Sequence, residues 1–165
     1  MTPPPAGSAR EPTPREPTPR EREAMREAID RALLASTQSG KSGIAATVLR
    51  GDAVIAIGEN EVHLRSDPTR HAEIVAIARA AAALGQTDLS GCTIISTLQP
   101  CEMCLAAIRF AKIDRILFAA TQANVPPKYF AFPHLTLQDF QNDAFEALGG
   151  IEEARVLHLY ESGDE

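Results

Sequence analysis

The sequence predicts one α/β domain, a three-layer α/β/α sandwich built on a five-stranded mixed sheet. The chain has 165 residues, 44% of them apolar, which is enough for a single domain with a substantial core. From residue 92 onward, short apolar runs of strand character alternate with segments whose apolar residues have helical spacing. Helical crossovers join parallel strands, whereas a tight turn joins the two runs nearest the N-terminus, so the sheet is expected to be mixed.

Residues 1–20 are interpreted as a disordered tail and residues 21–165 as the folded domain. Proline is dense in the tail, where Glu-Pro-Thr-Pro-Arg occurs at 11–15 and again at 16–20. Proline at this density is incompatible with a helix or an interior strand, and the tail lacks apolar residues to bury. A solvated extension is the expected state, and a partner-binding motif is the alternative.

The first half of the domain is expected to contain a helix, a hairpin and a second helix. Apolar residues at four-residue spacing predict the first helix over 21–35. Two apolar runs on either side of a tight Arg-Gly-Asp turn predict strands over 43–49 and 53–57. The second helix is expected over 68–84, with Asp67 as its cap. Its apolar stripe consists of Ile74, Ile77, Ala81 and Leu84.

The second half alternates between strands and helices. The expected elements are a strand over 92–98, a helix over 100–112, a strand over 113–120, a helix over 136–148 and a strand over 154–160. Thr136 is a suitable cap for the last helix, with Asp139 three residues later. Because a helix separates the last two strands, they are expected to pair in parallel.

Four side chains in two short motifs carry the chemistry. His71 and Glu73 belong to a His-Ala-Glu motif, and Cys101 and Cys104 belong to Pro-Cys-Glu-Met-Cys. Each motif lies at a predicted helix start, where the N-terminal end of a helix favours thiolate and other negative charge. Imidazole and thiolate are zinc ligands, and three of them leave a fourth position for water. A structural site with four protein ligands is the alternative, but Cys92 opens a buried strand and is interpreted as apolar filler.

The two motifs together resemble the signature of the zinc-dependent base deaminases. The resemblance covers residues 42–122 and is strongest to the bacterial guanine deaminase and tRNA adenosine deaminase group of the cytidine/deoxycytidylate deaminase-like superfamily. It implies one Zn²⁺ held by His71, Cys101 and Cys104, which lowers the pKa of a bound water. It also implies that Glu73 moves protons during hydrolytic deamination with release of ammonia, and that the protein is a homodimer.

The same resemblance implies several substrate contacts. Asn60 lies eleven residues before His71, at the spacing of an Asn that contacts the base in these relatives; a turn residue is the alternative. Ala72 is expected beside the substrate, and backbone groups from Thr97 to Gln99 are expected to bracket it. Relatives usually have Glu in place of Gln99, which changes one charge near the metal.

The loop after the fourth expected strand departs most from the family pattern. Residues 124–134 lack the runs that mark tRNA adenosine deaminases and guanine deaminases, and they contain an aromatic cluster instead, Tyr129, Phe130 and Phe132. Phe130 and Phe132 are therefore candidate stacking residues for a base. Simple packing, within the chain or on a neighbouring subunit, is the alternative for these rings.

Composition restricts the substrate and the compartment. The net charge is −6, and the basic surface typical of nucleic-acid binders is missing, so a small nucleobase or nucleoside is expected, with a purine such as guanine favoured. No run reaches the length of a membrane span, and no apolar leader precedes the domain. Of three cysteines, two are assigned to metal, which leaves no disulfide framework and fits the cytoplasm.

Three alternatives stay open. The substrate class is either a free base or nucleoside, as favoured above, or the adenosine of a tRNA. A cytosine-type base is a further possibility within the same chemistry. A third reading is a catalytically silent zinc-fold binding module, against which the intact Glu73 argues, because a purely structural zinc site needs no such carboxylate.

Overall fold

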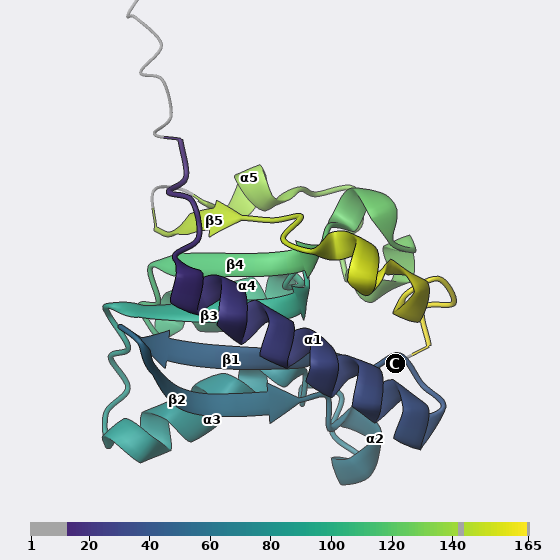
Figure 1. Cartoon of the computed structure of the whole chain (residues 1–165), viewed down its shortest axis with the longest axis horizontal. Coiled ribbons are helices and arrows are strands. Elements are labelled where there is room, and N and C mark those ends of the chain that lie inside the picture. The colour runs from purple at the N-terminus through teal and green to yellow at the C-terminus, as the bar shows by residue number, and fades with distance from the viewer. Residues whose placement is uncertain (1–12, 142–143, 165) are drawn as a thin grey trace, which may run out of the picture.

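The structure is a computed structural model that describes residues 13–141 and 144–164, and its centre is a five-stranded sheet between two helical layers (Figure 1). The strand order is β2-β1-β3-β4-β5. β1 is antiparallel to β2 and β3, whereas β4 is parallel to β3 and β5. This confirms the predicted three-layer class with a mixed sheet. The strands are β1 Ala45–Arg50, β2 Ala53–Glu59, β3 Cys92–Leu98, β4 Arg115–Ala120 and β5 Glu146–Leu148.

The helices divide between the two faces of the sheet. α1 crosses one face and packs on β1 and β3, while α3 and α4 lie side by side on the other (Figure 1). None of the described helices combines the length and apolar character that a membrane span requires. The α-helices are α1 Pro19–Ser39, α2 Val62–Arg65, α3 Ala72–Leu84, α4 Glu102–Phe110 and α5 Leu137–Gln141. Short 3₁₀ helices are η1 Gln122–Asn124, η2 Pro127–Tyr129, η3 Glu153–Arg155 and η4 Leu157–Leu159.

α1 begins two residues earlier than expected because Thr18 caps it. The Thr18 hydroxyl accepts a hydrogen bond from the backbone N of Glu21 at 3.1 Å, and the Glu21 carboxylate accepts one from the backbone N of Thr18 at 2.9 Å. This reciprocal box satisfies two amides that the first helical turn leaves without partners. The helix therefore includes the last two residues of the predicted tail. Residues 1–12 lie outside the described part of the chain, so disorder there stays a prediction.

α3 begins at Ala72 rather than Pro68, and Asp67 does not cap it. The Asp67 carboxylate instead accepts hydrogen bonds from the N and Oγ1 of Thr69, at 2.8 and 2.7 Å, a local turn typical of Asp. The four members of the predicted apolar stripe are only half-buried, and Ile74, Ile77 and Leu84 pack against the edge of the core. The face that meets the sheet consists of small residues: Ala72, Val75, Ala76 and Ala80.

A close backbone approach explains why α3 buries small residues. A Cβ atom on Gly58 of β2 would lie 2.3 Å from the carbonyl O of Ala72 and 2.6 Å from the backbone N of Ala76. The first turn of α3 therefore rests directly on the strand, with no room for larger side chains between them. This contact fixes the helix end that carries the residues of the predicted metal site.

The expected helix over 136–148 is wrong in extent. α5 ends at Gln141, and Glu146–Leu148 form the fifth strand; residues 142–143 lie outside the described part. Thr136 directly precedes α5, and its N and Oγ1 both donate to the Asp139 carboxylate, at 2.7 and 3.2 Å, which is half of the predicted capping pattern. The fifth strand has only three residues, which is too short to produce a visible alternating pattern.

The expected strand over 154–160 is also wrong. These residues lie in or next to η3 and η4, and only Val156 and Tyr160 among them are buried, by packing rather than by pairing with the sheet. Tyr160 is completely buried, and its hydroxyl donates to the carbonyl O of Gly43 at 2.8 Å. An apolar run with tertiary contacts of this kind has the same composition as a buried strand, so sequence pattern alone does not separate the two.

Candidate metal centre

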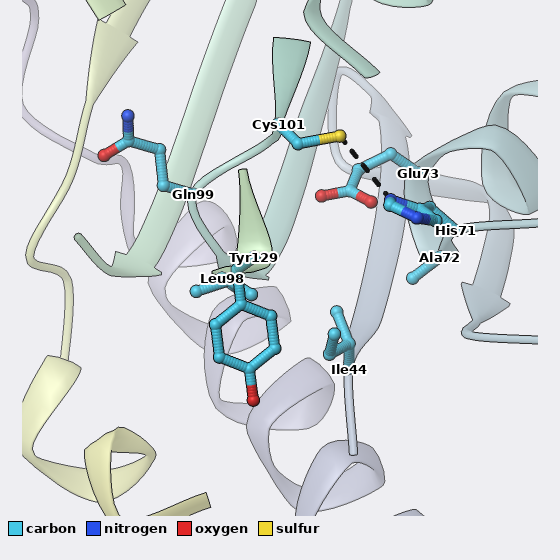
Figure 2. A pocket seen from close by; sticks show the side chains of 8 residues that line it. All are labelled: Ile44, His71, Ala72, Glu73, Leu98, Gln99, Cys101 and Tyr129. Atoms are coloured by element: carbon cyan, nitrogen blue, oxygen red, sulfur yellow. Dashed lines mark hydrogen bonds between the residues drawn. The ribbon is translucent and has the colours of Figure 1, made fainter. Parts of the chain in front are cut away.

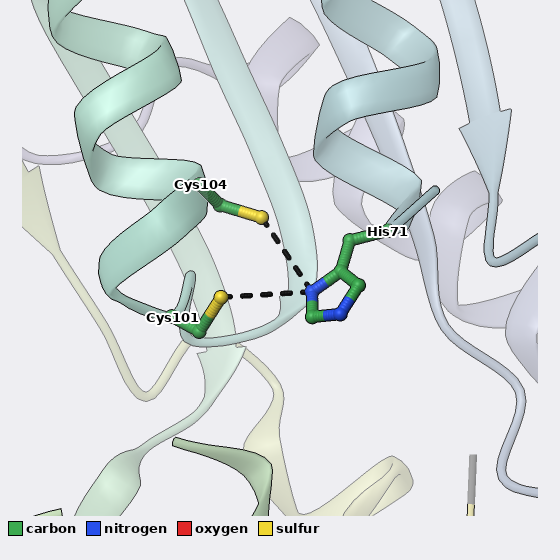
Figure 3. A group of neighbouring side chains, drawn as sticks. All are labelled: His71, Cys101 and Cys104. Atoms are coloured by element: carbon green, nitrogen blue, oxygen red, sulfur yellow. Dashed lines mark hydrogen bonds between the residues drawn. The ribbon is translucent and has the colours of Figure 1, made fainter. Parts of the chain in front are cut away.

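Two helix starts bring three metal-binding side chains together. His71 is the N-cap residue of α3, Cys101 is the N-cap residue of α4, and Cys104 follows one turn later. Since α3 and α4 are neighbours, the three side chains converge between them (Figure 3). The Sγ atoms of Cys101 and Cys104 lie 3.5 and 3.7 Å from His71 Nδ1. One ligand atom from each residue falls within 4.8 Å of the others.

This donor set fits zinc. One imidazole nitrogen and two sulfurs are typical ligands of Zn²⁺, and three protein ligands are the number found in catalytic sites. Among the described residues, no other group of three or more His, Cys, Asp or Glu side chains gathers in this way. Cys92 lies at the opposite end of β3 from the motif that follows this strand, so the described chain supplies no fourth cysteine ligand.

The two cysteines share one proton. A hydrogen bond from the Cys104 thiol lowers the pKa of Cys101 to about 4, against the opposing effect of burial, and His71 lowers it further. The pKa of Cys104 is raised, because its proton is held in that hydrogen bond and the thiol is buried. Thiolate is the form that binds metal, and a bound cation deprotonates a coordinating thiol. These contacts favour the thiolate form of Cys101.

Glu73 lies beside the ligand atoms on the first turn of α3. Its side chain is buried, its Oε1 accepts a hydrogen bond from Ser96 Oγ at 3.0 Å, and its Oε2 lies 3.4 Å from Cys104 Sγ. Burial raises the pKa of Glu73, and the negative charge of Cys101 adds to this. Ser96 was not predicted, because only the folded sheet brings it to Glu73.

A pocket opens onto this group of residues (Figure 2). It holds about 270 Å³ of empty space, part of which is open to solvent. Two predicted substrate contacts, Ala72 and Gln99, lie in its wall, and Tyr129 is an aromatic residue of the wall that was not predicted as a site residue. The described lining consists of Ile44, His71, Ala72, Glu73, Leu98, Gln99, Cys101 and Tyr129.

Two other predicted contacts are engaged elsewhere. The Oδ1 of Asn60 accepts a hydrogen bond from the backbone N of Val62 at 2.9 Å, as in a turn. The Oγ1 of Thr97 accepts one from the backbone N of Ala45 at 3.1 Å and lies 2.8 Å from the Tyr160 hydroxyl. Neither residue is in the described lining of the pocket. Their contact with a substrate stays a prediction.

The predicted aromatic residues also lie away from the pocket wall. The Phe132 side chain is 52% exposed, and Phe130 lines a second, smaller cavity of about 170 Å³. Gln99 borders both cavities, and its Oε1 accepts a hydrogen bond from the backbone N of Gln122 at 2.9 Å. Gln99 is therefore shared by the two cavities, and the aromatic residue that the loop contributes to the cavity beside the metal ligands is Tyr129.

Residues 18–120 match the family described as the cytidine and deoxycytidylate deaminase zinc-binding region. The chain is 35% identical over 96 residues to guanine deaminase of Bacillus subtilis, which covers 56% of this chain and 62% of that protein. It is 35% identical over 83 residues to a tRNA-specific adenosine deaminase of Aquifex aeolicus, covering 50% and 55%. It is 45% identical over 71 residues to a tRNA(Ile)-lysidine synthase of Deinococcus deserti, covering 43% and 13%.

The solved structures agree with this relationship. The X-ray structure of guanine deaminase from Bacillus subtilis has a TM-score of 0.56 and 34% identity, and the match covers 60% of this chain and 63% of that one. The chain spans less than two thirds of the length of each of these relatives. The family match includes all three ligand residues and Glu73. The chain therefore belongs to the family defined by the cytidine and deoxycytidylate deaminase zinc-binding region.

Proposed function

We propose that the chain is a zinc-dependent hydrolytic deaminase of a small nucleobase or nucleoside, with a purine base such as guanine favoured. The observation that carries the proposal is the buried Glu73 carboxyl beside three zinc ligands, at the wall of a pocket. A structural zinc site requires no such carboxyl. The likeness to a guanine deaminase supports the choice of purine.

Each residue of the site has a role in this reaction. A zinc ion held by His71, Cys101 and Cys104 supplies Lewis-acid activation of water at neutral pH. Ser96 fixes one oxygen of the Glu73 carboxyl, so the Oε2 atom faces the metal ligands. From there Glu73 would accept a proton from water and donate it to a ring nitrogen. It would then accept the remaining proton of the added hydroxyl group and donate it to the departing amine, as one positioned carboxylate can do.

The remainder of the pocket wall suits a flat heterocycle. Ile44, Leu98 and Tyr129 present apolar surface on the side away from Glu73 (Figure 2). Apolar walls exclude bulk water and strengthen the few polar interactions inside a pocket. The proposal also retains Asn60 and the backbone around Thr97 as contacts to the base.

Ammonia release tests the proposal directly. Zinc-loaded protein is incubated with guanine, guanosine, adenine, adenosine, cytosine and cytidine, and ammonia is measured. Guanine turnover is the expected result. The matched control is Glu73→Gln, which keeps the size of the side chain and removes its acid–base function, and it should retain zinc while losing nearly all turnover. No ammonia from any compound of the panel, and none from tRNA, would instead favour the silent binding module.

A tRNA adenosine deaminase is the second candidate, and a local group of arginines favours it. Arg65, Arg70 and Arg79 surround the single carboxylate of Glu61, at 3.6, 2.8 and 2.9 Å. Arg70 directly precedes the ligand His71. At this corner the three arginines carry more positive charge than Glu61 and the nearby Asp67 balance, although the whole chain is acidic, and arginines bind phosphate groups. Two relatives reported above also have names that refer to tRNA.

If the protein deaminates tRNA but neither free adenosine nor guanine, the second candidate function, a tRNA adenosine deaminase, is correct. In that case Arg70→Ala should weaken tRNA binding and reduce the salt dependence of binding, because one phosphate contact is lost. Equal tRNA binding by the wild type and Arg70→Ala at moderate salt argues against a role of this corner. Arg31→Ala, an exposed change on α1, is the charge-matched control.

Two further features belong to the same proposal. We infer a homodimer from the family resemblance, and light scattering at micromolar concentration should show about twice the 17.7 kDa mass of one chain. A species of single-chain mass alone would contradict this. A cytoplasmic location is proposed because the cysteines are assigned to metal binding, which requires reduced thiols.

A further inference from the structure

Glu102 connects the metal-binding end of α4 to the loop after β4. It is the first residue of α4, and only 8% of it is exposed. Its Oε2 accepts a hydrogen bond from the backbone N of Ala131, and its Oε1 accepts one from the backbone N of Phe132, both at 2.9 Å. Burial of a carboxylate is energetically unfavourable unless its oxygens accept hydrogen bonds. The two successive backbone amides provide one hydrogen bond to each oxygen. The helix N-terminus favours its negative charge.

This contact lies within the metal motif itself. Glu102 stands between the two cysteine ligands, so the loop is attached to the same helix turn that carries them. Three residues before Phe132, Tyr129 enters the wall of the pocket beside the metal ligands. The chain segment that follows Tyr129 is therefore held by the Glu102 carboxylate.

The hydroxyl end of Tyr129 is held independently. It donates a hydrogen bond to Ser42 Oγ at 2.9 Å, and Ser42 Oγ donates to the carbonyl O of Leu159 at 2.7 Å. The Tyr129 ring meets the Tyr160 ring edge-on, with 5.8 Å between their centroids and 79° between their planes. In Figure 2 the hydroxyl points away from Cys101, while the ring borders the pocket. Two anchors thus fix one aromatic ring.

We infer that Glu102 is a positioning residue. Its hydrogen bonds to the backbone of residues 131–132 hold the ring of Tyr129 in the pocket wall, where the ring selects a flat heterocyclic substrate. The assignment of the ligand as a flat ring rests on the proposed function. The ring of Tyr129 supplies apolar, stackable surface, and Glu102 supplies the rigidity that such a wall needs to distinguish substrates. Packing alone would not require a buried carboxylate on two backbone amides.

Hydrogen exchange tests the Glu102 contact without any substrate. In Glu102→Gln only one acceptor oxygen remains, and the new NH₂ group faces a backbone N–H. We expect amide exchange in the segment containing Ala131 and Phe132 to become about tenfold faster in zinc-loaded protein, because hydrogen bonds to a charged group are lost. Exchange in α3 should stay as in the wild type. Glu161→Gln, an exposed residue, removes the same charge and is the matched control.

Kinetics test the aromatic wall. With a substrate from the ammonia panel, Tyr129→Leu should raise KM about tenfold, as the loss of a stacking platform does, and Glu102→Gln should raise it in the same direction. Tyr129→Phe keeps the ring and should stay close to the wild-type KM. Metal analysis should show one zinc per chain in every variant, which separates a positioning role from a role in metal binding.

Each outcome decides the inference. Unchanged exchange at 131–132 in Glu102→Gln overturns it, and so does loss of zinc from that variant. Faster exchange with unchanged KM and kcat in both Glu102→Gln and Tyr129→Leu overturns the aromatic wall. If the wild type neither binds guanine in equilibrium dialysis nor deaminates any compound of the panel, the proposed function and the wall both fail, while the exchange data still decide the Glu102 contact.

Discussion

His71 and Cys101 occupy the same position, the N-cap, on two neighbouring helices. An N-cap side chain usually accepts a hydrogen bond from the helix backbone, but neither of these side chains does so. Each is therefore available to a metal, while the helix end behind it still stabilises negative charge. At these two helix starts the N-cap side chain is placed for metal binding and does not cap the helix by a hydrogen bond.

Loss of one ligand should be severe at this site. We expect His71→Ala to weaken zinc binding by more than the roughly 10–100-fold that loss of an outer hydrogen bond costs in metal sites. The measurement is zinc content after dialysis against a competing chelator. His158→Ala, an exposed histidine on η4, is the control and should keep its zinc. Full zinc occupancy in His71→Ala contradicts the ligand assignment.

The ligand residues could be predicted because their chemistry is local. Residue type, spacing and the helix starts identify His71, Cys101 and Cys104 without any knowledge of the fold. Ser96 could not be found in this way, and Tyr129 could be named only as one member of the aromatic cluster, because their roles depend on which strand or loop lies against the site in the folded chain. Contacts between segments distant in sequence leave no periodic signal.

At the scale of elements, the approach of α3 to β2 sets where the site lies. Gly58 faces the helix start that carries the ligand His71, and a side chain there would meet backbone atoms at 2.3 and 2.6 Å. Backbone cannot move aside as a flexible side chain can. The absence of a Cβ at this one position is therefore a requirement of the site as well as of the core.

We expect Gly58→Ala to lower the free energy of unfolding by about 1–3 kcal/mol, the usual cost of overpacking. It should also weaken zinc binding, because α3 must shift to relieve the contact. Urea unfolding and zinc content measure the two effects. Val54→Ala, a partly exposed change in the same strand, serves as the comparison. A Gly58→Ala protein as stable as the wild type rules out the close approach.

A buried ion pair joins α1 to the sheet on the opposite face. The Nε and Nη2 atoms of Arg115, the first residue of β4, donate to the two carboxylate oxygens of Glu21 at 2.9 and 3.0 Å. Arg115 also pairs with Glu146 of β5 at 2.8 Å. Two parallel hydrogen bonds of this kind are among the strongest that charged side chains make. One arginine thus ties a helix and two strands together.

This pair makes stability depend on pH. Burial alone would raise the pKa of Glu21, but the hydrogen bonds from Arg115 and Thr18 outweigh it, so the pKa lies below its ordinary value of 4.5. A lowered folded pKa contributes stability that is present above pH 4.5 and is lost as the pH falls through the folded value. We expect Glu21→Gln to lower the free energy of unfolding by about 3 kcal/mol at pH 7.

The difference between wild type and Glu21→Gln should therefore shrink as the pH falls below 4.5. Urea unfolding of both proteins between pH 3 and pH 7 provides the measurement. Glu27→Gln, an exposed residue of the same helix, should show no comparable effect. A difference that stays constant across this pH range would show that the Glu21 charge contributes nothing to folding.

The errors in the predicted elements have physical causes. Between Thr136 and Leu148 the apolar residues Leu137, Phe140 and Phe145 have nearly helical spacing, yet Phe145 and the strand after it are buried against the rest of the core. Residues 146–148 form a strand because they pair in parallel with β4, starting at Arg115. Tertiary pairing overrides a weak local preference in a strand of three residues.

At the scale of the whole molecule, the C-terminal segment closes against the start of the sheet. The Tyr160 hydroxyl donates to the carbonyl O of Gly43, and the backbone N of Ser42 donates to the carbonyl O of Asp164 at 2.6 Å. The same segment meets Tyr129 of the pocket wall. The metal ligands line one part of the pocket, and Tyr129, which contacts Tyr160 of the C-terminal segment, lines another. The shape of the pocket therefore depends on contacts between segments that are distant in the sequence.

The metal should therefore contribute to the stability of the entire fold. The ligands come from two helices that are thirty residues apart at His71 and Cys101, and a ligand that binds only the folded state stabilises it by about 4 kcal/mol at a thousand times its Kd. We expect chelation of zinc to lower Tm and added zinc to restore it. His71→Ala is the control, and its Tm should respond little to the chelator. A wild-type Tm that is the same with and without chelator, after metal analysis has shown that zinc was removed, contradicts this coupling of metal and fold.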